Sequence, residues 1–196
     1  MARQYYTGPL GDSLIIPQSA VSPGTTATSI FSIAQSNKYL PLPYGQNAPS
    51  PGQMFRVVCG GLCTTPSSGT IIIGAYQGPG TTTTAFGTLI GTSETITPTA
   101  SITAGYWRLE GNLIYRSISE VATTSTCWFN GLFQCGGPSA GALAVVHALI
   151  SSNAAVSVDT TGSGSAGTFG SLNFAVTPSV TGSTWTPEFA FIESLN

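Results

Sequence analysis

The chain has 196 residues, and only 6% of them are charged, five Lys or Arg and seven Asp or Glu, against about 25% in an average globular protein. This scarcity disfavours nucleic acid as a partner. The five basic residues cannot neutralise a row of phosphates, because they are scattered along the chain at Arg3, Lys38, Arg56, Arg108 and Arg116. A weakly charged surface repels copies of itself only weakly. The composition therefore favours a protein that works inside an assembly, with an extracellular, glycosylated or fibrous protein as the alternative.

Neither a signal peptide nor a membrane span is expected. The first residues lack a charged region followed by an apolar run. No stretch approaches the roughly 18 to 20 apolar residues that cross a bilayer. We therefore expect synthesis and folding in a cytoplasm, where cysteines remain thiols. A chain of this length suits a single domain whose core is large enough to need neither a metal nor a disulfide.

Residues 1–26 are rich in Pro, Gly, Ser and Thr and are interrupted by a few large apolar side chains. A floppy terminus is one interpretation, because chain ends are usually poorly ordered. The other is an extended arm that buries these side chains against a neighbour. We predict an N-terminal arm over 1–26 and a β-domain over 27–196. The arm's contact residues would be Arg3, Tyr5, Tyr6, Leu14, Ile15 and Ile16.

Alternating or β-branched runs predict the strands of the first half of the β-domain. Prolines in the segment 38–44 deny it a central place in a sheet. The pair Gly60-Gly61 lies near the end of one predicted strand, where it indicates a bulge or bend. The strands are expected at 28–33, 53–62, 70–76, 86–90 and 94–102.

The middle of the chain, 105–136, predicts a central antiparallel hairpin. Read with a period of two, its first arm places Arg108, Glu110 and Arg116 on a polar side that is available for pairing between subunits. Its second arm alternates in the same way. The inward side is predicted to carry Trp107, Leu109, Gly111, Leu113, Tyr115, Cys127, Phe129, Phe133 and Cys135.

Further strands are predicted at 156–161, 171–176 and 186–195. The segment 142–150 also suits a helix, but its length and β-branched centre favour a strand. The total of roughly eight to ten strands with no confident helix predicts an all-β fold. The predicted class is an antiparallel β-sandwich of jelly-roll type, and a barrel is the alternative.

The sequence gives little support for a catalytic site. His147 is the only histidine and lies in an apolar run, and no Gly-x-Ser-x-Gly elbow surrounds a serine. Glycine-rich 162–167 lacks the lysine of a phosphate-binding loop. A glycosidase would need two carboxylates across a cleft, and the sequence does not exclude this. The carboxylates are Asp12, Glu94, Glu110, Glu120, Asp159, Glu188 and Glu193.

No metal site and no cofactor are predicted, because the four cysteines lack zinc-ribbon spacing. Cys127 and Cys135 lie eight residues apart in phase, too far along one strand to bond with each other. Core thiols are the expectation. A bond between Cys59 and Cys63 across Gly60-Gly61 is the alternative.

Several stretches resemble the jelly-roll decoration (cement) proteins and related minor head proteins of tailed bacteriophages. They are Gly105-Tyr-Trp-Arg-Leu-Glu-Gly-Asn-Leu-Ile-Tyr-Arg-Ser, Asn130-Gly-Leu-Phe, Val158-Asp-Thr-Thr, Leu172-Asn-Phe-Ala-Val-Thr and the end of the chain from Glu188. The resemblance covers about the last 90 residues. It implies a homotrimer on the outer capsid surface of the virion, with the major capsid protein as partner and a terminal arm that clasps neighbours.

These observations predict a non-enzymatic viral structural protein. The alternative is a receptor- or glycan-binding domain of a head or tail fibre, for which Trp128 and Trp185 are the better exposed aromatic candidates. A glycan hydrolase needs two of the carboxylates in one cleft. A coat protein of a small RNA virus is disfavoured, because the chain has no basic arm.

Overall fold

The computed structural model describes residues 19–31, 40–41, 51–77, 87–97, 101–118, 125–139, 142–152, 155–158 and 171–195. These residues form eleven strands and no helix. The strands are β1 (Thr28–Ser29), β2 (Leu40–Pro41), β3 (Met54–Thr65), β4 (Ile71–Gln77), β5 (Thr88–Ser93), β6 (Ile102–Ser117), β7 (Ser125–Ser139), β8 (Ala142–Ser151), β9 (Val156–Val158), β10 (Ser171–Pro178) and β11 (Thr184–Ser194).

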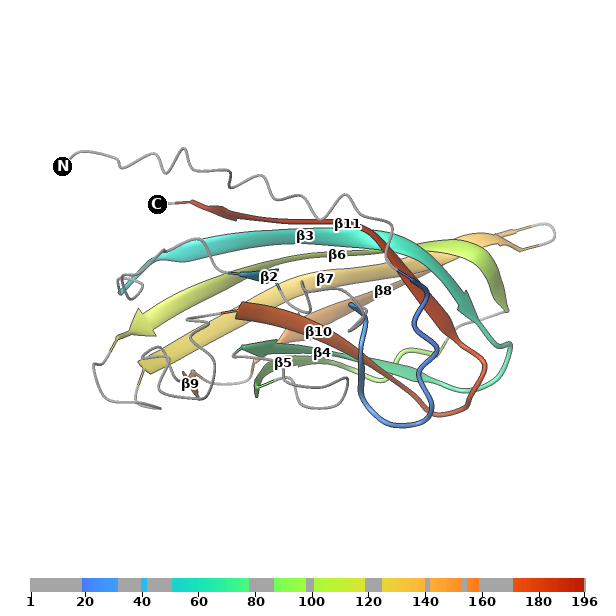
Figure 1. The fold of residues 1–196 in the computed structure, drawn as a ribbon, viewed down its shortest axis with the longest axis horizontal. Coiled ribbons are helices and arrows are strands. Elements are labelled where there is room, and N and C mark those ends of the chain that lie inside the picture. Colours follow the sequence, from blue (N-terminus) through green and yellow to red (C-terminus); the bar gives the residue numbers. More distant parts are fainter. Residues whose placement is uncertain are drawn as a thin grey trace.

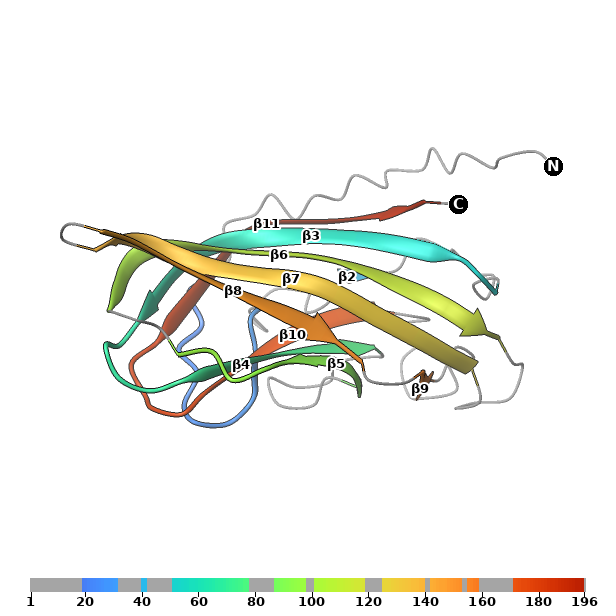
Figure 2. The ribbon, with the colours of Figure 1, turned by 180° about the vertical axis from the view of Figure 1, so that it is seen from behind.

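All of the strand pairs are antiparallel and belong to one sheet, with the order β1-β10-β4-β5-β8-β7-β6-β3-β11. β2 pairs with β10, and β9 pairs with β7. The sheet curls into a half-barrel, so that β11, β3, β6, β7 and β8 form one layer over β10, β4 and β5 (Figure 1; Figure 2 from behind). The prediction of an all-β antiparallel fold is confirmed.

The two-sheet sandwich is not confirmed, because β5 and β8 join the two layers. Thr92 pairs with Ser151 and Ser93 with Ile150 at this corner. A strongly twisted sheet of this width curls rather than staying flat. The curl lets both layers bury their inner faces against each other without ending the backbone ladder.

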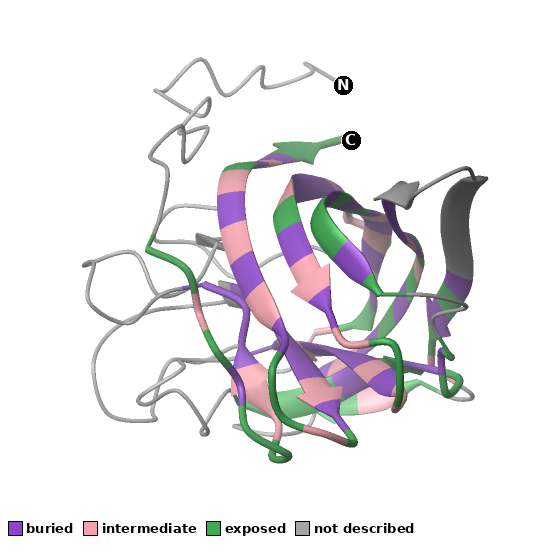
Figure 3. Cartoon of the chain, turned by 90° about the vertical axis from the view of Figure 1, so that its right-hand side faces the viewer, coloured by how far each residue is buried: buried purple, intermediate pink, exposed green. Residues whose placement is uncertain are grey.

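The core lies between the two layers, and alternation along each strand produces it. Figure 3 shows buried and exposed residues alternating along the strands. Aromatic rings pack in this core: Phe129 of β7 meets Phe174 of β10 across the two layers at 5.9 Å between ring centroids, and Phe174 also meets Phe31 at 6.4 Å. Trp107 and Trp185 meet at 6.3 Å. Every inward position predicted for the central hairpin is buried.

The central hairpin of β6 and β7 has the predicted pairing, and two glycines lie opposite each other at its middle. Gly111 pairs with Gly131, and the ring of Phe129 fills the space beside them. A Cβ at Gly111 would lie 2.5 Å from Phe129 Cζ. The missing side chains therefore let an aromatic ring pack directly on the backbone, which compensates for glycine in a strand.

The Gly60-Gly61 pair faces an irregularity in the partner strand. The register between β3 and β11 shifts between Pro187 and Phe189, opposite these glycines. The predicted bulge therefore lies in β11 rather than in β3. Proline has no N–H for the ladder, and a bulge is one of the few places where a strand accommodates it.

Several predicted boundaries are wrong. In the segment predicted as a strand at 94–102, the described residues 94–97 contain only an isolated bridge between Ile96 and Ile71, and Ile102 begins β6. Of the described residues in the strand predicted at 28–33, Thr28 and Ser29 pair with β10, and the Ile30 N–H donates to the Phe174 carbonyl oxygen at 2.8 Å. Residues 142–150 do form a strand, β8, and the helical alternative is wrong.

The start of the described chain lies against the body. Val21 and Trp185 exchange two backbone hydrogen bonds of 2.8 Å. Within the predicted arm, residues 19–26 therefore begin beside β11. The arm residues Arg3, Tyr5, Tyr6, Leu14, Ile15 and Ile16 lie outside the described residues.

Candidate functional site

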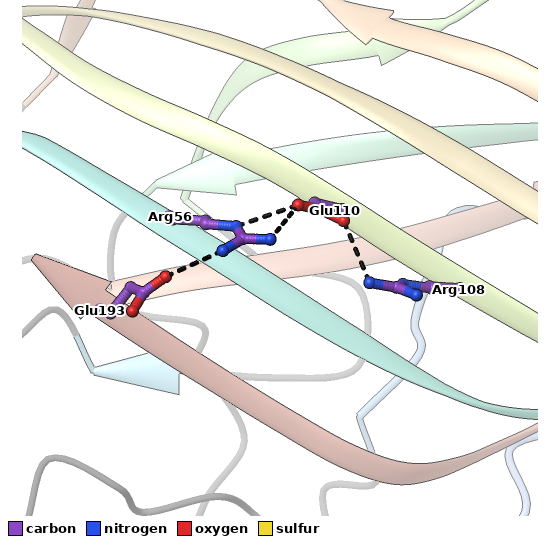
Figure 4. A network of polar contacts seen from close by, with 4 residues as sticks. All are labelled: Arg56, Arg108, Glu110 and Glu193. Carbon is purple, nitrogen blue, oxygen red and sulfur yellow. Dashed lines mark hydrogen bonds and ion pairs between the residues drawn. The ribbon is translucent and has the colours of Figure 1, made fainter. Parts of the chain in front are cut away.

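The layer formed by β11, β3, β6, β7 and β8 carries, on the side away from the core, a row of four charged side chains from three neighbouring strands (Figure 4). Arg56 of β3 lies at its centre. Its Nε donates to Glu110 Oε1 at 3.0 Å and its Nη1 to Glu193 Oε1 at 3.2 Å, while Nη2 also bridges to Glu110. Arg108 Nη2 donates to Glu110 Oε2 at 3.1 Å. The row therefore reads Glu193, Arg56, Glu110, Arg108, with alternating sign.

Strand register brings these residues together. Glu193 lies directly opposite Arg56, and Glu110 lies opposite Val58, which places it diagonally from Arg56. Arg108 and Glu110 are two residues apart on β6 and so share a face. The hydrogen bond from Arg56 lowers the pKa of Glu110, although partial burial acts in the opposite direction, and the same bond raises the pKa of Arg56.

We expect the pKa of Glu110 to lie below the usual glutamate value of about 4.3. Replacement of Arg56 by Gln should raise the pKa of Glu110, because it removes the hydrogen bond that lowers it. Because the carboxylate is favoured in the folded state, its contribution to stability is complete above the usual value and is lost as the pH falls below it. NMR titration of the Glu110 side-chain carboxyl measures its pKa in the wild type and in the Arg56→Gln variant. Equal midpoints in the two proteins would contradict the assigned role of Arg56.

Large apolar side chains surround the charged row. Among the described residues, eight large hydrophobic side chains are exposed, and Leu89 on β5 is the only one away from this face or its rim. Leu149 is the most exposed of them, at 70%. We call this surface the outer face. Its apolar members are Leu62, Tyr106, Trp128, Leu132, Leu149, Phe189 and, directly after β11, Leu195. Apolar side chains gathered in this way mark interaction surfaces.

The outer face is hollowed where β6, β7 and β8 run side by side. A hollow of about 370 Å³ lies between Glu110, Asn112, Asn130, Leu132 and Leu149. Its lining combines carboxylate, amide and leucine side chains. This mixture, open to the outside, suits a side chain of a partner better than an enclosed small molecule.

The third predicted subunit-contact residue, Arg116, does not join the charged row. Its guanidinium lies over the Trp128 ring, 5.1 Å from the centroid, in a cation–π contact. Trp128 is 40% exposed, whereas Trp185 is fully buried. The prediction that Trp185 is an exposed aromatic was therefore wrong, since Trp185 packs on Trp107 and Phe133 inside the core.

Arg108 and Glu110 were predicted to lie on one polar face, and the structure joins them. Arg56 and Glu193 were not predicted to belong to this face. Their alternation with buried neighbours was visible, but only the register of β3 with β6 and β11 shows that they meet Glu110.

All four cysteines are free and buried. Burial raises the pKa of Cys63 and Cys127 to about 12 and that of Cys135 to about 11. The pKa of Cys59 is raised further by the same cause. The prediction of core thiols is confirmed, and the alternative Cys59–Cys63 bond is wrong.

Glu110 and Glu193 are near each other, but both bind Arg56, and the lowered pKa of Glu110 is the opposite of what a general acid needs at neutral pH. Asp12, Glu120 and Asp159 lie outside the described part. Within it, no three His, Cys, Asp or Glu side chains group as metal ligands. It also contains no helix with the length and apolar character to cross a membrane.

Comparisons with protein-family models, with curated proteins and with solved structures found no match.

Proposed function

We propose that this chain is a non-enzymatic structural protein of a virion, a decoration (cement) protein on the head of a tailed bacteriophage. The observation that carries the proposal is the continuous backbone ladder. One curled sheet with strands of up to 16 residues connects the described body from edge to edge. Such a ladder resists mechanical load, and the low content of charge suits dense packing of copies.

The strand pairing supports the jelly-roll part of this proposal. The pairs are nested: β3 with β11, β4 with β10, β5 with β8 and β6 with β7. Rolling up one long hairpin, whose tip is β6–β7, produces this nesting and is a simple route to a jelly roll. The pairs β3–β6, β7–β8 and β4–β5 are additional, and they connect the four nested pairs into one sheet.

The proposed partner is the major capsid protein, bound by the N-terminal arm of a homotrimer on the capsid surface. The Val21–Trp185 pair supports this, because it holds the described end of the predicted arm, residues 19–26, against β11. An apolar arm that orders on docking gives weak contacts that copy number multiplies. Arg3, Tyr5, Tyr6, Leu14, Ile15 and Ile16 would make these contacts.

The test uses heads from the virus whose genome encodes this chain, assembled with it, without it, and with a variant lacking residues 1–18. We expect the full chain to cosediment with heads in a fixed ratio and to raise the temperature at which they release DNA. The shortened variant should fold but not bind. Absence of the chain from purified particles, or equal stability of heads with and without it, would overturn the proposal.

A further inference from the structure

We propose that the outer face binds the same face of a second copy of this chain, about a two-fold axis that lies in the plane of the contact. This inference does not depend on the proposed function, because it uses only the surface of the isolated chain. Exposed apolar side chains mark the outer face as a candidate contact surface. The charged row identifies which partner it fits.

The row has no net charge and alternates in sign along its length: Glu193, Arg56, Glu110, Arg108. A strongly basic or acidic partner would gain no net attraction from it. An apolar partner would desolvate all three ion pairs without adding a partner for any of these charges, which is costly. The complementary surface is a second row of the same alternation in the opposite direction, and a second copy of this chain supplies it.

The geometry of facing sheets gives the pairing. Seen in projection on the contact plane, the two-fold axis acts as a mirror line. Each residue of one copy therefore faces the residue of the second copy whose position is its mirror image across that line. An axis that crosses the row between Arg56 and Glu110 sets Arg56 against Glu110 of the second copy. With strands about 4.8 Å apart and alternate residues about 6.7 Å apart along a strand, the backbone of Glu193 then falls within about 3 Å of the position facing Arg108. Every contact along the row joins opposite charges.

The apolar side chains fit the same operation. Leu132 lies opposite Glu110 on β7, beyond the charged row, and reflection places it over Met54 and Ile114 of the second copy. Leucine thus meets an apolar pair. Leu149, the next residue across the sheet from Leu132, extends the apolar part of the contact.

A two-fold contact through the outer face is compatible with three-fold contacts through other surfaces. If only the two-fold contact forms in solution, the oligomer contains two copies of the chain. If the two-fold and the three-fold contacts both form, it contains six. In either case the outer face predicts an even number of copies.

The test is a pair of charge reversals, Arg108→Glu and Glu193→Arg, studied by sedimentation equilibrium. In either variant alone, each two-fold pair would contain two like-charge contacts, so we expect each to associate at least tenfold more weakly than the wild type and to fall to half its number of copies. Mixed in equal amounts, the two variants should regain the wild-type mass, because each mixed pair has two opposite-charge contacts.

The apolar contact is tested with Leu149→Glu, and the matched control is Leu89→Glu, since Leu89 is 45% exposed on β5 away from the outer face. We expect only Leu149→Glu to halve the number of copies, with circular dichroism unchanged in both. An odd number of copies in the wild type, reversals that keep the wild-type mass, or a mixture that fails to regain it would overturn the proposed pairing.

Discussion

Replacement of Gly61 by Ala is expected to destabilise the protein by about 3 kcal/mol or more, toward the upper end of what overpacking costs. The bulge in β11 brings its backbone onto Gly61, so a Cβ there would run into the carbonyl oxygen of Thr186 and lie 2.9 Å from the backbone N of Glu188. A flexible side chain could rotate away from such a clash. Backbone atoms held in the ladder cannot, so β3 and β11 would have to separate locally.

Urea unfolding followed by the fluorescence of the buried tryptophans measures this change. The matched control is Gly24→Ala, because a Cβ at Gly24 meets nothing within 4 Å; we expect this control to stay within about 0.5 kcal/mol of the wild type. A Gly61→Ala protein that is too unstable to purify beside a normal control counts as the expected loss. Equal midpoints for the two variants would show that β11 does not lie over Gly61 in this way.

Raising the pH is expected to unfold the protein near pH 10, because four thiols are held protonated by burial. The folded pKa values lie at about 11 for Cys135, about 12 for Cys63 and Cys127 and higher for Cys59, against about 8.5 for a thiol in the unfolded chain. Above about pH 8.5 only the unfolded state releases these protons, so stability falls as pH rises toward the folded values. Each thiol contributes about 1.4 kcal/mol per pH unit.

For the four thiols together the loss reaches about 8 kcal/mol by pH 10, which is comparable with the whole stability of a domain. Urea unfolding under reducing conditions at several pH values between 7.5 and 10 measures the slope. The control is the double variant Cys127→Ala, Cys135→Ala: tyrosines ionise equally in both proteins, so the difference in slope isolates two thiols. An unchanged slope would contradict the assignment of the loss to the buried cysteines.

Alternation was sufficient to predict which side of the central hairpin is buried. Trp107, Leu113 and Phe129 all face the core as predicted, because the period of two follows from the covalent geometry of an extended chain. Trp185 was misplaced, because its neighbours Ser183, Thr184 and Thr186 are polar or small and give alternation no apolar partner to follow.

What the sequence by itself determined is therefore the class of fold, the hairpin and its two faces, and the core thiols. These are local properties that each strand carries in its own pattern. Only the tertiary structure decided that the sheet curls without breaking and that Arg56 and Glu193 complete a row with Glu110 and Arg108. Those contacts join strands far apart in the chain: Arg56 and Glu193 are separated by 137 residues. Their meeting depends on the register of β3 with β11. Alternation excludes a slip of one residue, which would turn the buried side chains outward, but it does not distinguish registers that differ by two residues.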